Sequence, residues 1–247
     1  MIFQSGSDIF QKSTQDLRDY SLGEQIGHGA YAVVKECTHL KTGERYAVKQ
    51  YDLAKFTFER KRQVQREIRV LQHLAHGGLC ALKESLVTPT HVCLVLEKAR
   101  GVSLHQHLKA QPLKRLQECE VKQIIKEVLK VLEFLHRKQV THRDIKLENI
   151  IFDPKTQTLK LIDFGFCCLG NESLQTLYCG TPSYMAPEIV RRSPHCGPPT
   201  DIWATGVLTY CLLTGKLPFT ASSDQQLFQV IQNKDSLQYP LYVTLES

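Results

Sequence analysis

Two short polar runs near the middle of the chain constrain its fold more than any other feature. The first run, HRDIKLEN, covers residues 142–149, and the second, DFG, covers residues 163–165. Each run lies next to a short apolar segment, NIIFD or LKLIDF, that has the composition of a β-strand. The pattern therefore predicts polar loops at strand ends, where Asp144 could act as a base and Asn149 and Asp163 could bind a metal ion.

The two halves of the chain differ in their hydrophobic pattern. Up to Leu96, short alternating segments separated by turns predict β-strands, interrupted by a helix at Phe58–Leu74. After Glu97 the pattern becomes helical, with an amphipathic helix at Glu118–Arg137 and a helix at Asp201–Gly215 that is apolar nearly all round. We therefore expect an α+β fold with a β-rich first lobe, a mainly helical second lobe and a ligand-binding cleft between them.

Length and composition are those of an ordinary globular protein. The chain has 247 residues, of which 42% are hydrophobic and 23% are charged, enough for two lobes with a sizeable core. No segment reaches the ~18 uninterrupted apolar residues that a membrane helix needs, so we expect no membrane span. Residues 1–19 are polar and mixed in charge, and we interpret them as a lead-in segment rather than a signal peptide. The first lobe would then cover residues 20–96 and the second residues 97–247.

The cysteines indicate a reducing compartment. There are nine, an odd number, and none has the paired spacing of a zinc site. We therefore expect the protein in the cytoplasm or the nucleus. The neighbouring residues Cys167 and Cys168 cannot form an ordinary structural disulfide with each other, and we interpret them as loop side chains rather than as a redox-sensitive thiol.

The formal net charge is +6, and much of the positive charge lies in one run, residues 55–69. A nucleic-acid surface or a nuclear localisation signal would use such a run. The chain offers no platform of interleaved aromatic residues on which bases could stack. We therefore interpret the run as the solvated face of a helix and expect no nucleic-acid partner.

Four further motifs complete a set that resembles the eukaryotic serine/threonine protein kinase domain. They are GHGAYAVV at residues 27–34, AVK at 47–49, CGTP at 179–182 and MAPE at 185–188. Together with HRDIKLEN and DFG they match the kinase signature from Tyr20 to the C-terminus, and they are closest in style to the calcium/calmodulin-dependent kinase group. The resemblance implies a bilobal fold that transfers the γ-phosphate of Mg-ATP to serine or threonine hydroxyls of protein substrates.

The resemblance assigns most of the nucleotide-binding residues to the first half of the chain. Gly27 and Gly29 belong to a loop over the phosphates, where glycine lets backbone amides approach phosphate oxygens, and Ala32 replaces the third glycine of the family pattern. Lys49 would contact the α- and β-phosphates and form an ion pair with Glu67 on the following helix. The remaining implied contacts are those to adenine: Val34, Ala47 and Ile151 around the ring, Leu96 at the rear pocket, and the backbone of Glu97 and Ala99.

The resemblance places the reaction chemistry in the second half. Asp144 would accept the proton of the substrate hydroxyl or orient it, and Lys146 would neutralise the phosphate in transfer. Asn149 and Asp163 would hold Mg²⁺, which prefers oxygen ligands. Thr181 would contact the candidate base and the lysine beside it.

The resemblance also suggests how the chain is regulated. In kinases that carry an arginine at the position of Arg143, a phosphate on the activation segment pairs with it and orders the loop. The usual phosphothreonine position is Leu177 here, so we expect Thr176 to carry an activating phosphate from an upstream kinase. The alternative is activity without loop phosphorylation. Phe164 would stack in an apolar column with Leu71, Leu82 and His142.

The second lobe is expected to be incomplete relative to the family. A helix is predicted at residues 227–235, but the family's later helices, which supply an arginine partner for Glu188, have no counterpart in this sequence. We therefore expect an exposed apolar face near Trp203 and Leu213, and a buried unpaired Glu188 that costs about 3–5 kcal/mol. A catalytically silent kinase-fold module, which binds nucleotide or a protein partner, is the alternative function. The presence of every catalytic residue named above favours the enzyme.

Overall fold

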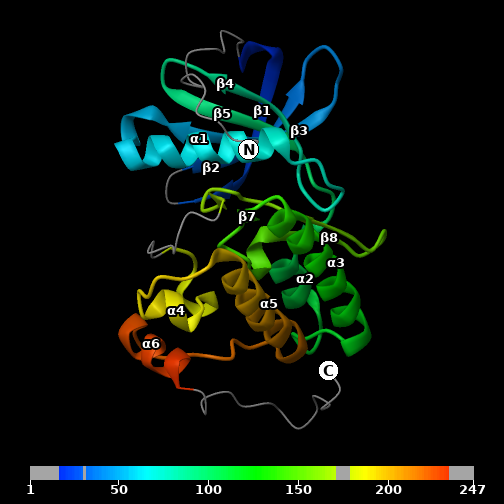
Figure 1. The fold of residues 1–247 in the computed structure, drawn as a ribbon. Helices are drawn as coiled ribbons and strands as arrows, with labels where there is room; N and C mark the ends of the chain where they lie inside the picture. The colour runs from blue at the N-terminus through cyan, green and yellow to red at the C-terminus, as the bar shows by residue number, and fades with distance from the viewer. Residues whose placement is uncertain (1–16, 30–31, 171–178, 234–247) are drawn as a thin grey trace. The chain divides into compact units, whose positions relative to one another are not determined.

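The computed structural model describes residues 17–29, 32–170 and 179–233. The chain divides into two compact units, unit 1 at Met1–Ala99 and unit 2 at Arg100–Ser247 (Figure 1). Unit 1 is dominated by one sheet and unit 2 by helices, which confirms the predicted α+β class. The boundary falls after Ala99, whereas the sequence pattern placed it after Leu96.

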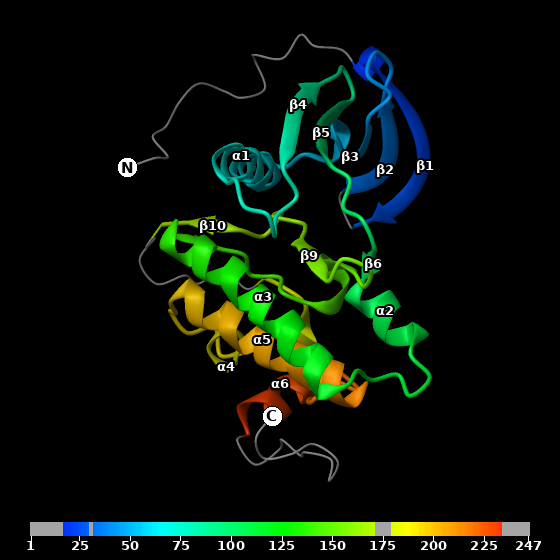
Figure 2. The ribbon, with the colours of Figure 1, turned by 90° about the vertical axis from the view of Figure 1, so that its right-hand side faces the viewer.

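Unit 1 is built on an antiparallel sheet of five strands in the order β1-β2-β3-β5-β4 (Figure 2). The turn between β2 and β3 contains Gly43, whose φ of 70° suits a residue without a side chain. Strand β4 was not predicted, because its sequence LKESLV has too little apolar alternation to be recognised. The strands are β1 Tyr20–His28, β2 Ala32–His39, β3 Arg45–Asp52, β4 Leu82–Val87 and β5 His91–Glu97.

The sheet curls enough for side chains of its two edge strands to make contact. Tyr20 on β1 donates a hydrogen bond from its hydroxyl to Glu84 on β4, although these strands are the opposite edges of the sheet. Burial raises the pKa of the Tyr20 phenol, so it keeps the proton that it donates. The side of the sheet inside the curl, called the inner face here, carries a buried cluster made of Tyr20, Cys37, Val48, Leu86, Cys93 and Val95.

Helix α1, Phe58–His73, packs on the other side of the sheet, called the helix face here. The helix starts at the N-cap Thr57, whose hydroxyl accepts a hydrogen bond from the backbone N–H of Arg60 at 3.2 Å. Four apolar residues at helical spacing form one stripe, of which Val64, Ile68 and Leu71 are buried within the helix and Leu74 is buried directly after it. The predicted amphipathic helix is therefore confirmed.

Unit 2 is organised around two long helices that pack against each other, α3 at Glu118–Arg137 and α5 at Gly197–Thr214 (Figure 2). The predicted amphipathic helix α3 buries one apolar stripe, made of Val121, Ile124, Val128, Leu132 and Leu135. Among the described residues, no helix is long and apolar enough to cross a membrane. The smaller elements are α2 Leu104–Ala110, α4 Pro187–Val190, α6 Asp224–Gln232, β6 Val102–Ser103, β7 Val140–Thr141, β8 Ile150–Asp153, β9 Thr158–Leu161 and β10 Cys168–Leu169.

The start of α5 differs from the prediction. The helix begins at Gly197 rather than at Asp201, because two prolines occupy its first turn. Proline has no N–H to donate, and the first N–H groups of a helix lack an intrahelical acceptor, so prolines are tolerated there. The helix ends at the C-cap Gly215, whose φ is 73°.

The expected exposed apolar face of α5 is present in part. Ile202 is 49% exposed, but Trp203 is half-buried and its ring stacks on Phe219 with centroids 5.9 Å apart. The expectation of a buried Glu188 is wrong, because its side chain is half-buried. Within the described part of the chain its carboxylate has no hydrogen-bond or ion-pair partner.

Gly101, which precedes β6, offers a test of this packing. Its φ is 101°, and a Cβ atom added there would lie 2.1 Å from the carbonyl oxygen of Phe152 on β8. We expect Gly101→Ala to lower the free energy of unfolding by more than the ~1–2 kcal/mol of a left-handed residue alone, because β8 must also move. Urea unfolding of the whole protein, followed by circular dichroism, measures the change in the free energy of unfolding.

Gly206 in α5 is the matched control for that substitution. A Cβ atom at Gly206 meets nothing within 4 Å, and the residue lies inside a helix. Alanine should therefore raise the free energy of unfolding by roughly 0.5–1 kcal/mol, the opposite sign. Equal unfolding midpoints for the two variants would contradict the predicted role of Gly101.

Candidate active site

In unit 1, Lys49 on β3 and Glu67 on α1 form a buried ion pair. The Lys49 Nζ lies 2.8 Å from the Glu67 Oε1, and the two side chains are 9% and 2% exposed. Lys49 points to the helix face because residues alternate between the two sides of a strand. A buried pair of this kind fixes the ammonium in one position, since either charge would be costly without its partner.

Tyr51 completes this pair and was not predicted. Its hydroxyl donates a hydrogen bond to the second carboxylate oxygen of Glu67, and the Lys49 Nζ lies 5.2 Å from the centroid of its ring. Burial raises the pKa of Tyr51 well above its usual value, so the phenol remains a donor. Its position two residues after Lys49, on the same side of the strand, was the available signal.

The register of the sheet brings four of the predicted nucleotide-binding residues onto the helix face. Val34 lies directly opposite Lys49, and Ala47 lies directly opposite Leu96. Opposed residues in an antiparallel pair share one face, so these side chains form one surface. The backbone N–H of Glu97 donates to the carbonyl of Ala81 at 2.8 Å.

The glycines of the predicted phosphate loop are not required by the fold itself. A Cβ atom at Gly27 would lie 3.6 Å from the Cβ of Val34, and one at Gly29 would lie 3.9 Å from the carbonyl of Ala32, which are ordinary contacts. The Gly29 N–H donates to Ala32 at 2.8 Å, and residues 30–31 lie outside the described ranges. Glycine at these positions therefore fits a need for close approach by a ligand.

In unit 2, three predicted residues converge on the carboxylate of a fourth, Asp144. Asp144 is 4% exposed, and its Oδ1 accepts a hydrogen bond from the Thr181 hydroxyl at 2.9 Å. Its Oδ2 accepts from the Asn149 amide at 2.8 Å and lies 2.7 Å from the Lys146 Nζ. Lys146 also donates to the Thr181 hydroxyl at 3.0 Å. Both oxygens of Asp144 are therefore held in place by hydrogen-bond donors.

Asp201 at the first turns of α5 holds the loop that carries Asp144. It is 1% exposed, and its Oδ1 accepts from the backbone N–H of Arg143 at 2.8 Å. Its Oδ2 accepts from the backbone N–H of His142 at 3.0 Å and lies 2.9 Å from the Nε2 of His136. His136, on the last turn of α3, was not predicted, since a polar residue at a helix end carries no signal of its own.

Asn149 and Asp163 offer the oxygen ligands that Mg²⁺ requires. The Asn149 amide nitrogen donates to the carbonyl and the carboxylate of Asp144, so its amide oxygen is oriented away from these bonds. Asp163 has a φ of 64° and accepts from the backbone N–H of Gly165 at 3.1 Å. The Ile162 N–H donates to the Asn149 carbonyl at 2.9 Å, which ties the two loops together. These donors fit magnesium.

The DFG segment contacts the loop before it. The Phe164 ring meets the His142 ring edge-on, with centroids 4.9 Å apart. Arg143 is 8% exposed, and its Nε donates to the Phe166 carbonyl at 2.6 Å. The predicted phosphorylation position Thr176 lies outside the described residues.

The neighbouring cysteines after the DFG segment are enclosed. Cys167 and Cys168 are each 2% exposed, and all nine cysteines are free thiols. Burial therefore supports the interpretation of this pair as ordinary side chains.

Comparison with known proteins gives a consistent result over nearly the whole chain. The family described as protein kinase domain matches residues 20–245. The chain is 34% identical over 222 residues to the serine/threonine protein kinase OSK3 of Oryza sativa subsp. indica. The aligned region covers 89% of this chain and 43% of the relative. It is 36% identical to the maternal embryonic leucine zipper kinase of Xenopus tropicalis, over 87% of this chain and 33% of the relative.

A third relative is the SNF1-related protein kinase catalytic subunit alpha KIN12 of Arabidopsis thaliana. It is 33% identical over 92% of this chain and 46% of its own length. The chain thus spans less than half the length of these curated relatives. The relatives agree with the predicted likeness to the calcium/calmodulin-dependent kinase group. With a family match over residues 20–245, the chain belongs to the protein kinase domain family.

Proposed function

We propose that this chain is an active serine/threonine protein kinase that transfers the γ-phosphate of Mg-ATP to protein hydroxyls. The observation that carries the proposal is the arrangement of Asp144, Lys146, Asn149 and Thr181, joined by hydrogen bonds and one ion pair of 2.7–3.0 Å. A silent module would have no need to hold a buried carboxylate, an ammonium and a hydroxyl in mutual contact. The similarity to serine/threonine kinases supports the same reaction.

Asp144 acts on the substrate hydroxyl in this proposal. A carboxylate placed beside a serine or threonine hydroxyl accepts its hydrogen bond, orients the oxygen for attack and takes the proton as the new phosphate ester bond forms. Thr181 fixes one oxygen of Asp144 at 2.9 Å. Lys146 supplies a positive charge next to the same carboxylate, where it can offset the negative charge of the phosphate in transfer.

Lys49 and Glu67 serve the nucleotide. The ammonium of Lys49, held by Glu67 at 2.8 Å, can donate to the α- and β-phosphates without losing its position. Asn149 and Asp163 would hold magnesium, and the ion when bound neutralises charge on the phosphate oxygens. The hydrogen bonds of both residues to neighbouring backbone or side-chain groups keep these oxygens oriented before any ligand arrives.

Arg143 and Thr176 form the regulatory part of the proposal. A phosphate on Thr176, added by an upstream kinase, would pair with the guanidinium of Arg143 and order the segment between them. Mass spectrometry of active protein should therefore find phosphate at Thr176. Active protein without any phosphate between Gly165 and Ala186 would instead establish activity without loop phosphorylation.

Phosphotransfer from labelled Mg-ATP to a peptide library tests the proposed reaction. The library should contain serine and threonine peptides beside otherwise identical alanine and tyrosine peptides. We expect label on the serine and threonine peptides alone, and loss of labelling when a chelator removes Mg²⁺. Label on the serine and threonine peptides would also report the sequence preference of the kinase.

No transfer by folded protein would overturn the proposal. Folding is verified by a cooperative thermal unfolding curve at the assay concentration. Under that outcome, binding of ATP without transfer would favour the silent kinase-fold module. Transfer that continues at full rate in the chelator would contradict the role assigned to Asn149 and Asp163.

A further inference from the structure

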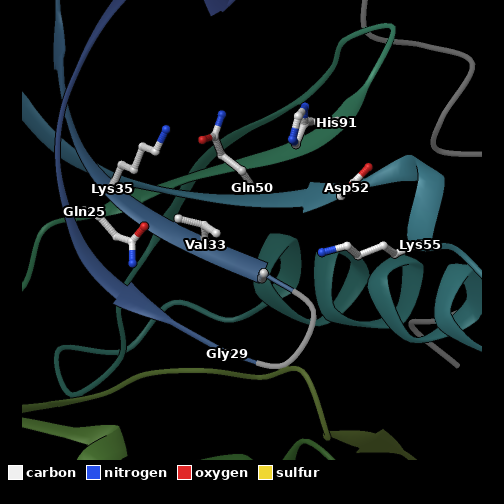
Figure 3. Close-up of a pocket in the computed structure, with 9 residues that line it drawn as sticks. Gln25, Gly29, Val33, Lys35, Gln50, Asp52, Lys55 and His91 are labelled. Carbon is white, nitrogen blue, oxygen red and sulfur yellow. The ribbon is translucent and has the colours of Figure 1, made fainter.

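The curl of the sheet in unit 1 opens at one end into a polar cavity of about 270 Å³ (Figure 3). The cavity is lined by residues from β1, β2, β3 and β5 and by Lys55 after β3. Figure 3 shows the Lys55 side chain extending toward Val33 across the cavity. The polar residues among those lining it are Gln25, Lys35, Gln50, Asp52, Lys55 and His91.

The polar side chains of this cavity lie on the inner face, and among the residues assigned to ATP Gly29 of the phosphate loop also lines it. Lys35 lies directly opposite Gln25, and Asp52 lies directly opposite His91, so each pair shares one side of the sheet. Lys49 is adjacent to Gln50 in sequence and therefore points to the other side. The other end of the inner face carries the buried cluster around Tyr20.

Two cations in the cavity lack a partner. Over residues 17–29, 32–170 and 179–233, the ammonium groups of Lys35 and Lys55 have no hydrogen-bond or ion-pair partner in the protein. Lys35 is half-buried, which makes an unpaired charge there less favourable than on an open surface. The amide of Gln25 and the ring of His91, whose Nδ1 is 2.8 Å from the Thr90 hydroxyl, add further polar groups.

Asp52 restricts which anion could bind among these cations. Its Oδ1 accepts from the backbone N–H of Ala54 at 2.9 Å, and its carboxylate lines the same cavity. A carboxylate repels an anion that has only acceptor oxygens, but it accepts a hydrogen bond from an anion that carries a hydroxyl. Hydrogen phosphate carries such a hydroxyl at neutral pH. Sulfate does not, and a phosphoserine above its second pKa of about 6 does not either.

We propose that this cavity is a binding site for inorganic hydrogen phosphate. Lys35 and Lys55 neutralise the anion, and Asp52 accepts the hydrogen bond from its hydroxyl. The size of the cavity suits a small ligand, and the open end of a curled sheet is a recurrent place for one. Its side chains lie on the opposite face of the sheet from Lys49, and the site meets the proposed nucleotide site at Gly29.

Isothermal titration with sodium phosphate, at neutral pH, constant ionic strength and without ATP, tests the proposal. We expect wild-type protein to bind phosphate at least about tenfold more tightly than sulfate or free phosphoserine. The double variant Lys35→Gln/Lys55→Gln should lose at least about tenfold in phosphate affinity. The exposed α3 pair Lys122→Gln/Lys126→Gln removes the same charge and should leave the affinity unchanged.

Asp52→Asn distinguishes hydrogen phosphate from other anions. Asparagine keeps an oxygen that can accept from Ala54, but it no longer repels sulfate. We expect this variant to bind sulfate and phosphate with similar affinity.

Absence of phosphate binding by the wild type would overturn the proposed site. Unchanged phosphate binding by the double lysine variant would place the anion elsewhere, for example at Lys49, and tighter binding of phosphoserine than of phosphate would overturn the assigned ligand.

Discussion

Asp144→Asn is expected to slow phosphotransfer by roughly 10²–10⁴-fold, the usual contribution of a positioned acid–base group. Asparagine cannot accept a proton from the substrate hydroxyl at neutral pH. It also replaces one carboxylate oxygen by an NH₂ group. That group would face either the Asn149 amide, the Lys146 ammonium or the Thr181 hydroxyl, all of which donate to Asp144 or lie beside it.

The measurement is steady-state phosphotransfer to the best peptide of the library, with ATP binding measured separately. We expect kcat to fall while the Kd for ATP changes little, because the roles proposed for nucleotide binding lie with other residues. Glu133→Gln is the matched control, since it makes the same carboxylate-to-amide change at an exposed position of α3. It should leave kcat unchanged. An Asp144→Asn rate within about threefold of wild type would contradict an acid–base role for this residue.

Asp201→Asn is expected to lower the free energy of unfolding by about 3–5 kcal/mol, because it removes a buried charge from its partners. The carboxylate accepts hydrogen bonds from two backbone N–H groups and lies 2.9 Å from the His136 Nε2. Asparagine has one acceptor oxygen, so its NH₂ group would face a backbone donor. Arg143, with a φ of 66°, depends on these bonds to remain in the left-handed region.

Urea unfolding of the whole protein, followed by circular dichroism, measures this loss of stability. Phosphotransfer should fall as well, since the backbone held by Asp201 carries the candidate base. Glu133→Gln is again the control, and its effect should lie within about 0.5 kcal/mol of zero. A change below about 1 kcal/mol for Asp201→Asn would contradict the proposed role as an anchor of the loop.

Much of this architecture could be predicted because local patterns were strong. The apolar stripes of α3 and α1 each follow one clear periodicity. The convergence of Asp144 and Thr181, which lie 37 positions apart, could not come from periodicity. It was expected only because the motifs match those of a known family, and their contact in the structure agrees with that expectation.

Other features depend on tertiary contacts that carry no local signal. Strand β4 is defined by its pairing with β5, and α5 begins among prolines that usually mark a break. Tyr51 and His136 acquire their roles from Glu67 and Asp201, which are distant in sequence. The polar cavity arises only when the sheet curls, so alternation alone could not locate it.

The contact between Tyr20 and Glu84 has a consequence for how the first unit is made. Its two partners are separated by 64 positions, so β1 leaves the ribosome long before β4 exists. Closing so long a stretch of chain costs conformational entropy, and burial of apolar side chains offsets this cost only afterwards. We therefore expect this contact to form late in folding. Until then Tyr20 lacks the carboxylate that accepts its hydrogen bond in the finished fold. Strand β1 therefore reaches its final contacts only after the strand that contains Leu86 has been synthesised.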